Sequence, residues 1–163
     1  MEIDIRFEDA PEYAYELMRN LIAQHFKELG DCKILILMDL KERKTGDMIT
    51  LGRITKTNDL TRHLTIDESG SDSGYDYIMY LDKMMWGNTD DADRIRIIRH
   101  ELRHTHVNIE SKNPYKLRPH TIEDFHSEVN LNTDDPRWRD RVGVLVATKY
   151  ESLKNSQQKL PGM

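Results

Sequence analysis

Residues 95–104 read Ile-Arg-Ile-Ile-Arg-His-Glu-Leu-Arg-His, a helical apolar pattern that runs directly into an HExxH motif. On a helix, His100 and His104 lie one turn apart on the same face, so both imidazoles can reach one metal ion. Glu101 lies beside that face, where its carboxylate could polarise a water molecule bound to the metal. The stretch therefore predicts a helix that carries two metal ligands and a general base.

A catalytic zinc site needs three protein ligands and one open position, so a third ligand has to come from elsewhere in the chain. His120 follows His104 by sixteen residues, and the intervening Asn113-Pro114 allows the chain to turn back. The alternatives are three carboxylates further on: Glu123, Asp124 and Glu128. His106 is a poor candidate, because a continuing helix would point it away from the ligand face.

Hydrophobic periodicity predicts the remaining elements. We expect helices over 10–29, 91–107, 121–131 and 136–154, strands over 33–39, 48–55 and 75–81, and a loop over 58–74. This order predicts a small α+β fold: an N-terminal helix and a three-stranded sheet, then the HExxH helix and two C-terminal helices. With no repeat or internal break in composition, 1–155 is interpreted as one domain and 156–163 as a frayed tail.

Composition narrows the class of protein. The chain has 163 residues, of which 33% are charged and 37% hydrophobic, as expected of a rather polar globular protein. The longest apolar run, residues 34–38, is far too short to span a bilayer, and the N-terminus lacks the pattern of a secretory signal. Cys32 is the single cysteine, which excludes an internal disulfide and a cysteine-based zinc site. We therefore expect a cytoplasmic protein without a membrane partner.

Charge gives a weaker indication of partners. The net charge of −5 offers no general attraction for nucleic acid. Four arginines nevertheless cluster before and within the motif: Arg94, Arg96, Arg99 and Arg103. We interpret them as a solvated helix face, and the alternative is a basic groove for an acidic partner such as DNA.

The residues around the motif resemble those of a known family. His100–His104, followed by Pro119-His120-Thr121-Ile122-Glu123-Asp124-Phe125, resembles the phage metallopeptidase family, a zincin-like group with an HELxH helix, a loop and an H-x-x-E-[DE]-F element. The chain is also similar to SprT-like zincins, including the spartan proteases, in which a third histidine follows HExxH after a loop. It departs from the family pattern at Thr121, where an acidic residue is common, and at Asn130-Leu131-Asn132, which replaces an Arg-Tyr-Gly-like stretch.

This resemblance implies a zincin-like fold and a zinc-dependent metallopeptidase of a phage or prophage type. The zinc ligands that it implies are His100, His104 and His120. Glu101 takes the role of general base, which accepts a proton from a metal-activated water during peptide hydrolysis. Glu123 or Asp124 would orient a ligand histidine through its other ring nitrogen.

Some zincins use an additional side chain to stabilise the oxyanion that forms during hydrolysis. Tyr115 and Arg118 lie in the loop before His120 and are the candidates for that donor. The alternative to an enzyme is a catalytically inactive module of the same fold, which binds a metal structurally or binds a protein or DNA partner. The presence of Glu101 favours the peptidase.

A peptide or protein substrate also needs a binding surface. In a zincin, the strand along the cleft offers its edge to an extended peptide, which pairs through main-chain hydrogen bonds. We expect the strand over 75–81 to be that edge, with Tyr77 and either Met79 or Tyr80 shaping the side-chain pockets.

Overall fold

A computed structural model gives the structure of residues 3–120 and 125–159. The elements in chain order are β1 (Phe7–Asp9), α1 (Glu12–His25), η1 (Lys27–Leu29), β2 (Ile34–Asp39), β3 (Lys44–Thr45), β4 (Met48–Ile49), β5 (Gly52–Lys56), α2 (Asp59–Leu64), α3 (Ile66–Ser69), β6 (Tyr77–Asp82), α4 (Lys83–Asn88), α5 (Asp91–Arg103), β7 (Thr105–Val107), β8 (Tyr115–Leu117), α6 (His126–Leu131) and α7 (Trp138–Lys159). The predicted α+β class is confirmed.

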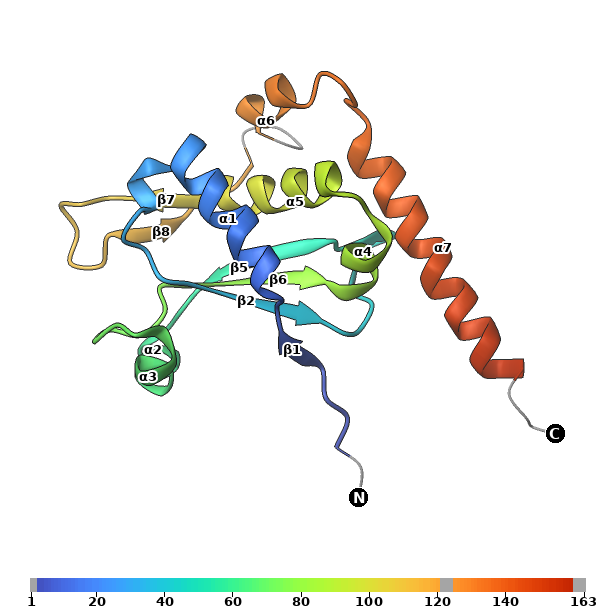
Figure 1. Cartoon of the computed structure of the whole chain (residues 1–163), viewed down its shortest axis with the longest axis horizontal. Helices are drawn as coiled ribbons and strands as arrows, with labels where there is room; N and C mark the ends of the chain where they lie inside the picture. The colour runs from blue at the N-terminus through green and yellow to red at the C-terminus, as the bar shows by residue number, and fades with distance from the viewer. Residues whose placement is uncertain (1–2, 121–124, 160–163) are drawn as a thin grey trace.

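A four-stranded sheet with the order β1-β2-β6-β5 lies at the centre of the molecule (Figure 1). β2 and β6 run parallel, whereas β1 and β5 pair antiparallel with their neighbours. The sheet has one strand more than the three predicted. The additional strand, β1, spans only three residues, too few for a recognisable pattern. The strand expected over 75–81 is β6, which lies inside the sheet. The expectation that it offers an edge to a substrate is therefore wrong, since the edges are β1 and β5.

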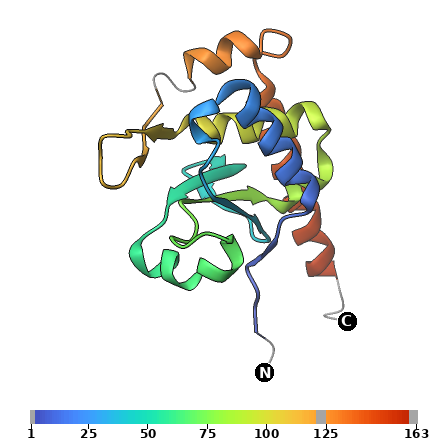
Figure 2. The same cartoon turned by 60° about the vertical axis from the view of Figure 1, so that its left-hand side comes forward.

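The helices α1 and α5 lie side by side over one face of this sheet (Figures 1 and 2). Period-two alternation directs fully buried side chains of β6 to one face of the sheet: Tyr77, Met79 and Leu81. From α5, Ile98 and Leu102 are also fully buried in this core. Burying such a side chain contributes about 1.5–3 kcal/mol. This packing fixes the position of the motif helix over the sheet.

The segment 58–74, for which we expect a loop, contains the short helices α2 and α3. Asn58 caps α2, since its side chain accepts a hydrogen bond from the backbone N–H of Thr61. Neither helix contains a buried residue, so neither has the apolar stripe that a sequence pattern would reveal. Another short helix, α4, follows β6 directly and is capped by the side chain of Asp82.

The motif helix begins as predicted but ends earlier. Asp90 caps α5 by accepting a hydrogen bond from the backbone N–H of Asp93. The helix stops at Arg103 rather than near residue 107, because residues 105–107 form β7 and pair with β8. Strand pairing thus replaces the last helical turn and changes the direction of the chain just after the motif.

Two helices follow in the C-terminal part, as predicted. The start of the helix expected over 121–131 lies outside the described residues, and α6 covers its second half. The last helix, α7, extends to Lys159, beyond the end expected at residue 154. None of the helices described is both long and apolar enough to cross a membrane.

Candidate metal centre

The last turn of α5 and its C-cap residue, His104, present two histidines and a glutamate. His100 and Glu101 are almost fully buried, with 1% and 4% of their surface exposed. The imidazoles of His100 and His104 lie on the same side of the helix, with ring centroids 5.5 Å apart. The i, i+4 spacing therefore brings these two side chains together, as the pattern predicts.

Backbone contacts after the helix orient His104. Its Nδ1 lies 2.9 Å from the carbonyl oxygen of Arg118, which can only accept, so Nδ1 carries the proton. The backbone N–H of Arg118 in turn donates to the carbonyl of His104 at 2.7 Å. The proton on Nδ1 leaves the lone pair on Nε2, the ring nitrogen on the other side, available for a metal.

His120 completes the group from the segment after β8. Its Nε2 lies 3.0 Å from Nε2 of His100, and its ring centroid is 4.5 Å from that of His104. One ligand atom from each histidine lies within 4.8 Å of the others, so the three residues could hold one metal ion. Sixteen residues after His104 the chain thus returns to the motif helix, and His120 lies where the third ligand was expected. His106 is exposed in β7.

The carboxylate alternatives to His120 fall into two groups. Glu128 is completely buried and accepts hydrogen bonds from Arg99 Nε at 2.7 Å and from Arg103 Nε at 3.2 Å. Both oxygens are therefore occupied by arginines, and Glu128 joins α6 to α5. Glu123 and Asp124 lie outside the described residues.

Phe125 backs the three imidazoles. Its ring centroid lies 5.4 Å from that of His100, 5.0 Å from His104 and 5.1 Å from His120. Only 2% of the surface of Phe125 is exposed, so its ring is buried beside the histidines. An apolar ring behind the imidazoles holds them in place and keeps water from one side of the centre.

The donor set suits zinc. Neutral imidazole is a preferred zinc ligand, and three histidines with an open fourth position form one of the recurring catalytic zinc sites. Two nitrogens bound to one zinc ion at about 2.05 Å in tetrahedral geometry lie about 3.3 Å apart. The separation of 3.0 Å between the Nε2 atoms of His100 and His120 is close to that value. The residues present therefore fit the ion.

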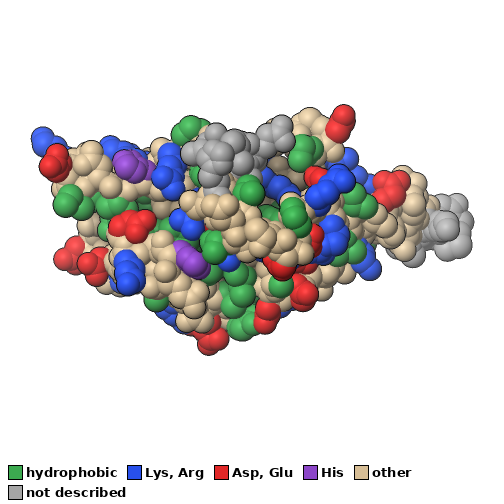
Figure 3. All heavy atoms as spheres, turned by 90° about the horizontal axis from the view of Figure 1, so that it is seen from above, with side chains coloured by type: hydrophobic (Ala, Val, Ile, Leu, Met, Phe, Trp, Pro, Cys, Tyr) green, Lys and Arg blue, Asp and Glu red, His purple; other side chains and the backbone are tan. Residues whose placement is uncertain are grey.

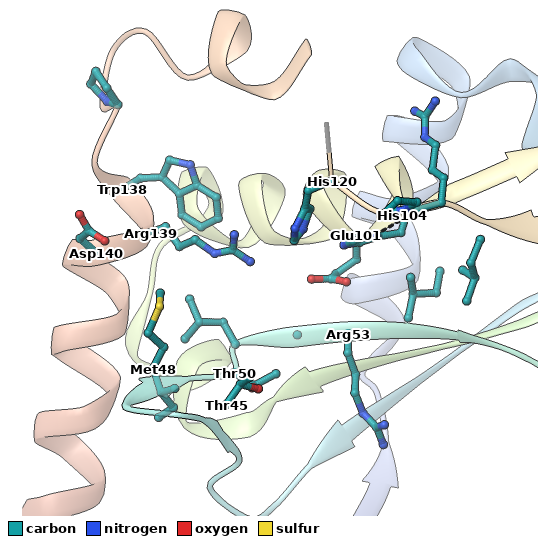
Figure 4. A pocket seen from close by; sticks show the side chains of 18 residues that line it. Thr45, Met48, Thr50, Arg53, Glu101, His104, His120, Trp138, Arg139 and Asp140 are labelled. Carbon is teal, nitrogen blue, oxygen red and sulfur yellow. Dashed lines mark hydrogen bonds between the residues drawn. The ribbon is translucent and has the colours of Figure 1, made fainter. Parts of the chain in front are cut away.

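A cleft of about 990 Å³ opens beside His104 and His120 (Figure 4). The edge strand β5 and the preceding residues 48–51 line one wall, the segment 117–120 lines another, and the first turn of α7 closes a third side. The carboxylate of Glu101 and the guanidinium of Arg139 both point into this cavity. Arg139 is the site residue that sequence reasoning missed, because no spacing rule connects the start of α7 to the motif.

Close contact between β5 and α5 positions the glutamate. Gly52 pairs with Leu81, and a Cβ atom at this position would lie 3.2 Å from Ile97 Cγ2 and 3.4 Å from Glu101 Cγ. The helix can approach the edge strand this closely because residue 52 has no side chain. Glu101 is thus held between its own helix and the strand that lines the cleft.

The arginine cluster of α5 is neither a solvated face nor a free basic groove. Arg96, whose side chain is 9% exposed, forms ion pairs with Asp93 at 2.8 Å and Asp134 at 2.5 Å. Arg99 and Arg103 bind Glu128, and Arg94 pairs with Asp91 and donates to the carbonyl of Trp86. The carboxylates that bind these arginines belong to this same chain. Figure 3 likewise shows side chains of both signs interspersed over one face.

Three converging imidazoles, a buried glutamate and an adjoining cleft together define an α+β protein with a candidate hydrolytic metal centre. The sequence profile of a family described as "Putative phage metallopeptidase" matches residues 5–150, and the chain belongs to this family. No curated protein and no solved structure matches the chain. The family inferred from residues 100–104 and 119–125 is therefore confirmed, whereas the relation to SprT-like zincins stays a prediction.

Proposed function

We propose that this protein is a zinc-dependent metallopeptidase whose ligands are His100, His104 and His120 and whose general base is Glu101. The observation that carries the proposal is the convergence of three imidazole nitrogens within 4.8 Å beside a buried glutamate that points into an open cleft. A noncatalytic metal site would not require a buried carboxylate at the mouth of a cleft, since burying an ionised group is costly.

The proposed chemistry divides the work between the ion and the side chains. Zinc, when bound by the three histidines, would acidify a water molecule and polarise the peptide carbonyl. Glu101 accepts the proton of the attacking water and returns it to the nitrogen of the leaving amine as the C–N bond breaks. Arg118 contributes its backbone carbonyl, which holds the His104 ring in the required tautomer.

We further propose that the substrate is an extended peptide that pairs with β5. This strand is an edge of the sheet, lines the cleft, and passes next to Glu101 at Gly52. A peptide added to this edge would gain main-chain hydrogen bonds along its length, and alternate side chains would enter the cleft. In this proposal β5 takes the substrate-binding role expected of its neighbour, the strand over 75–81.

Replacing Glu101 tests the proposal. Glu101→Gln keeps the size of the side chain but removes the base, so the rate of cleavage of fluorescein-labelled casein is expected to fall by about 10²–10⁴-fold. Its zinc content should equal that of the wild type. Glu110→Gln, an exposed position in the β7–β8 connection, is the matched control and should cleave casein at the wild-type rate. Equal rates for Glu101→Gln and the wild type would refute the assignment of the base.

A further inference from the structure

The first turn of α7 is held firmly against the motif helix. Trp138 is 3% exposed and Val142 is completely buried. Arg141 donates to both oxygens of Asp93 in α5, at 3.0 and 2.6 Å, and binds Asp135 at 2.9 Å. These contacts leave little freedom to the backbone on either side of residue 139.

Arg139 extends from this fixed turn into the cleft. Its Nη2 lies 3.2 Å from Nε2 of His100, one hydrogen-bond length from a nitrogen of the proposed metal centre. Figure 4 shows the guanidinium directed towards His120 and the carboxylate of Glu101. A permanent positive charge therefore lies beside the point where the histidines converge.

His100 Nε2, which Arg139 approaches, is also the atom that would bind a metal ion. When this nitrogen binds a cation, it no longer accepts a hydrogen bond from Arg139, and the guanidinium would then face a second positive charge. A negatively charged oxygen placed between the two cations would interact favourably with both. The oxygen of a peptide carbonyl acquires that charge when water adds to its carbon.

We propose that Arg139 is a catalytic residue that donates a hydrogen bond to the oxyanion of the substrate, an inference that rests on the proposed peptidase function. Water adds to the carbonyl carbon, its proton passes to Glu101, and the carbonyl oxygen takes the negative charge. When the C–N bond breaks, the carbonyl re-forms and Glu101 protonates the leaving nitrogen. Arg139 keeps its own proton throughout and interacts most strongly with the charged intermediate.

The two donors expected from the sequence are placed less favourably. Arg118 donates through Nε to the carbonyl of Arg103 at 2.7 Å, and its guanidinium lies over the ring of Phe125. Tyr115 packs edge-on against Tyr77, with ring centroids 5.9 Å apart, and is absent from the described residues that line the cleft. Tyr115 therefore packs on the sheet, whereas Arg118, which also lines the cleft, is held against the end of α5 and Phe125.

Arg139→Ala and Arg139→Lys test the proposal, with Arg137→Ala as the matched control. Arg137 lies in the turn just before α7, two residues before Arg139, but its side chain is 85% exposed and pairs with Asp140. Kinetics are measured on a fluorogenic peptide taken from the sites at which the wild type cleaves casein. For Arg139→Ala, kcat should fall by about 10²–10³-fold while KM changes less than about threefold. Arg139→Lys should recover part of the lost kcat, and Arg137→Ala should keep the wild-type kcat.

Binding experiments distinguish an interaction with the transition state from an interaction with the bound substrate. A phosphinic analogue of the same peptide carries a tetrahedral anion, so Arg139→Ala should weaken its Kd, measured by calorimetry, by about 10²-fold. Binding of the uncleaved peptide, measured in a Glu101→Gln background, should stay within about threefold, and zinc content should stay unchanged.

Three results would overturn the inference. If KM and uncleaved-peptide binding weaken as much as the phosphinic analogue, Arg139 binds the ground state. If zinc content falls, Arg139 positions His100 instead. If kcat is unchanged, the oxyanion donor is another group. In each case a wild type that cleaves casein and binds zinc leaves the peptidase proposal intact, whereas a wild type that does neither refutes that proposal itself.

Discussion

Glu128→Gln is expected to destabilise the protein strongly without removing a metal ligand. Glu128 is completely buried and receives hydrogen bonds from Arg99 at 2.7 and 3.1 Å and from Arg103 at 3.2 Å. Arg99 also binds the side-chain oxygen of Asn132 at 2.7 Å. Neutralising the one carboxylate leaves two arginines, each less than 15% exposed, without their negative partner.

The magnitude follows from that geometry. Breaking a buried ion pair by removing one partner costs about 3–5 kcal/mol. For a chain of this length, about 3 kcal/mol corresponds to a fall of roughly 6–12 °C in Tm. The matched control is Asp134→Asn, which removes a partner of Arg96 whose side chain is 69% exposed, and which should cost about 1 kcal/mol or less.

Urea denaturation of the apoprotein, with a chelator present, measures both free energies of unfolding. Zinc binding is then measured separately on the folded variants. The reasoning would be refuted if Glu128→Gln left the stability of the apoprotein unchanged but abolished zinc binding. That result would make Glu128 a ligand, one of the alternatives that the sequence leaves open.

Two further substitutions probe the elements that surround the site. Burial raises the pKa of Asp82 to about 6, so its charge, which burial disfavours, forms in the folded state only above that pH. The contribution of this group to the free energy of unfolding should therefore fall by about 3 kcal/mol as the pH rises from 4 to 6. Tyr150→Phe removes a hydrogen-bond donor to Asp82, so in urea denaturation it should lower the free energy of unfolding more at pH 8 than at pH 5. An equal loss at both pH values would contradict this. Gly52→Ala should lower kcat without changing zinc content. Its Cβ would lie only 3.2 Å from Ile97 Cγ2 and from the backbone oxygen of Tyr80, so the turn of α5 that carries Glu101 would have to shift. Gly87→Ala, an open helical position, should leave kcat unchanged.

Sequence reasoning succeeded where one local pattern determines the structure. The i, i+4 spacing of His100 and His104 is a property of a single helix, and period-two alternation identified β6 with its buried face. The return of His120 was predicted from a loop of suitable length and from the family resemblance. These features depend on short stretches of chain whose geometry is nearly fixed.

The errors concern contacts between distant segments. No local pattern distinguishes an interior strand from an edge strand, so β6 was predicted as the edge that β5 forms. Arg99 and Arg103 suggested a solvated face, because the carboxylate that binds them, Glu128, lies 29 and 25 residues further along the chain. Arg139 lies 39 residues from His100, and only the packing of α7 brings them together.

Zinc content tests the central claim most directly. The wild type, purified without added metal and analysed by mass spectrometry of the element, should contain one zinc ion per chain. His120→Ala should lose most of it, because two histidines rarely hold a catalytic ion, while His106→Ala, an exposed histidine in β7, should keep it. A wild type without zinc that also fails to bind it on titration, or a His120→Ala variant with undiminished zinc, would contradict a metal centre formed by the three histidines.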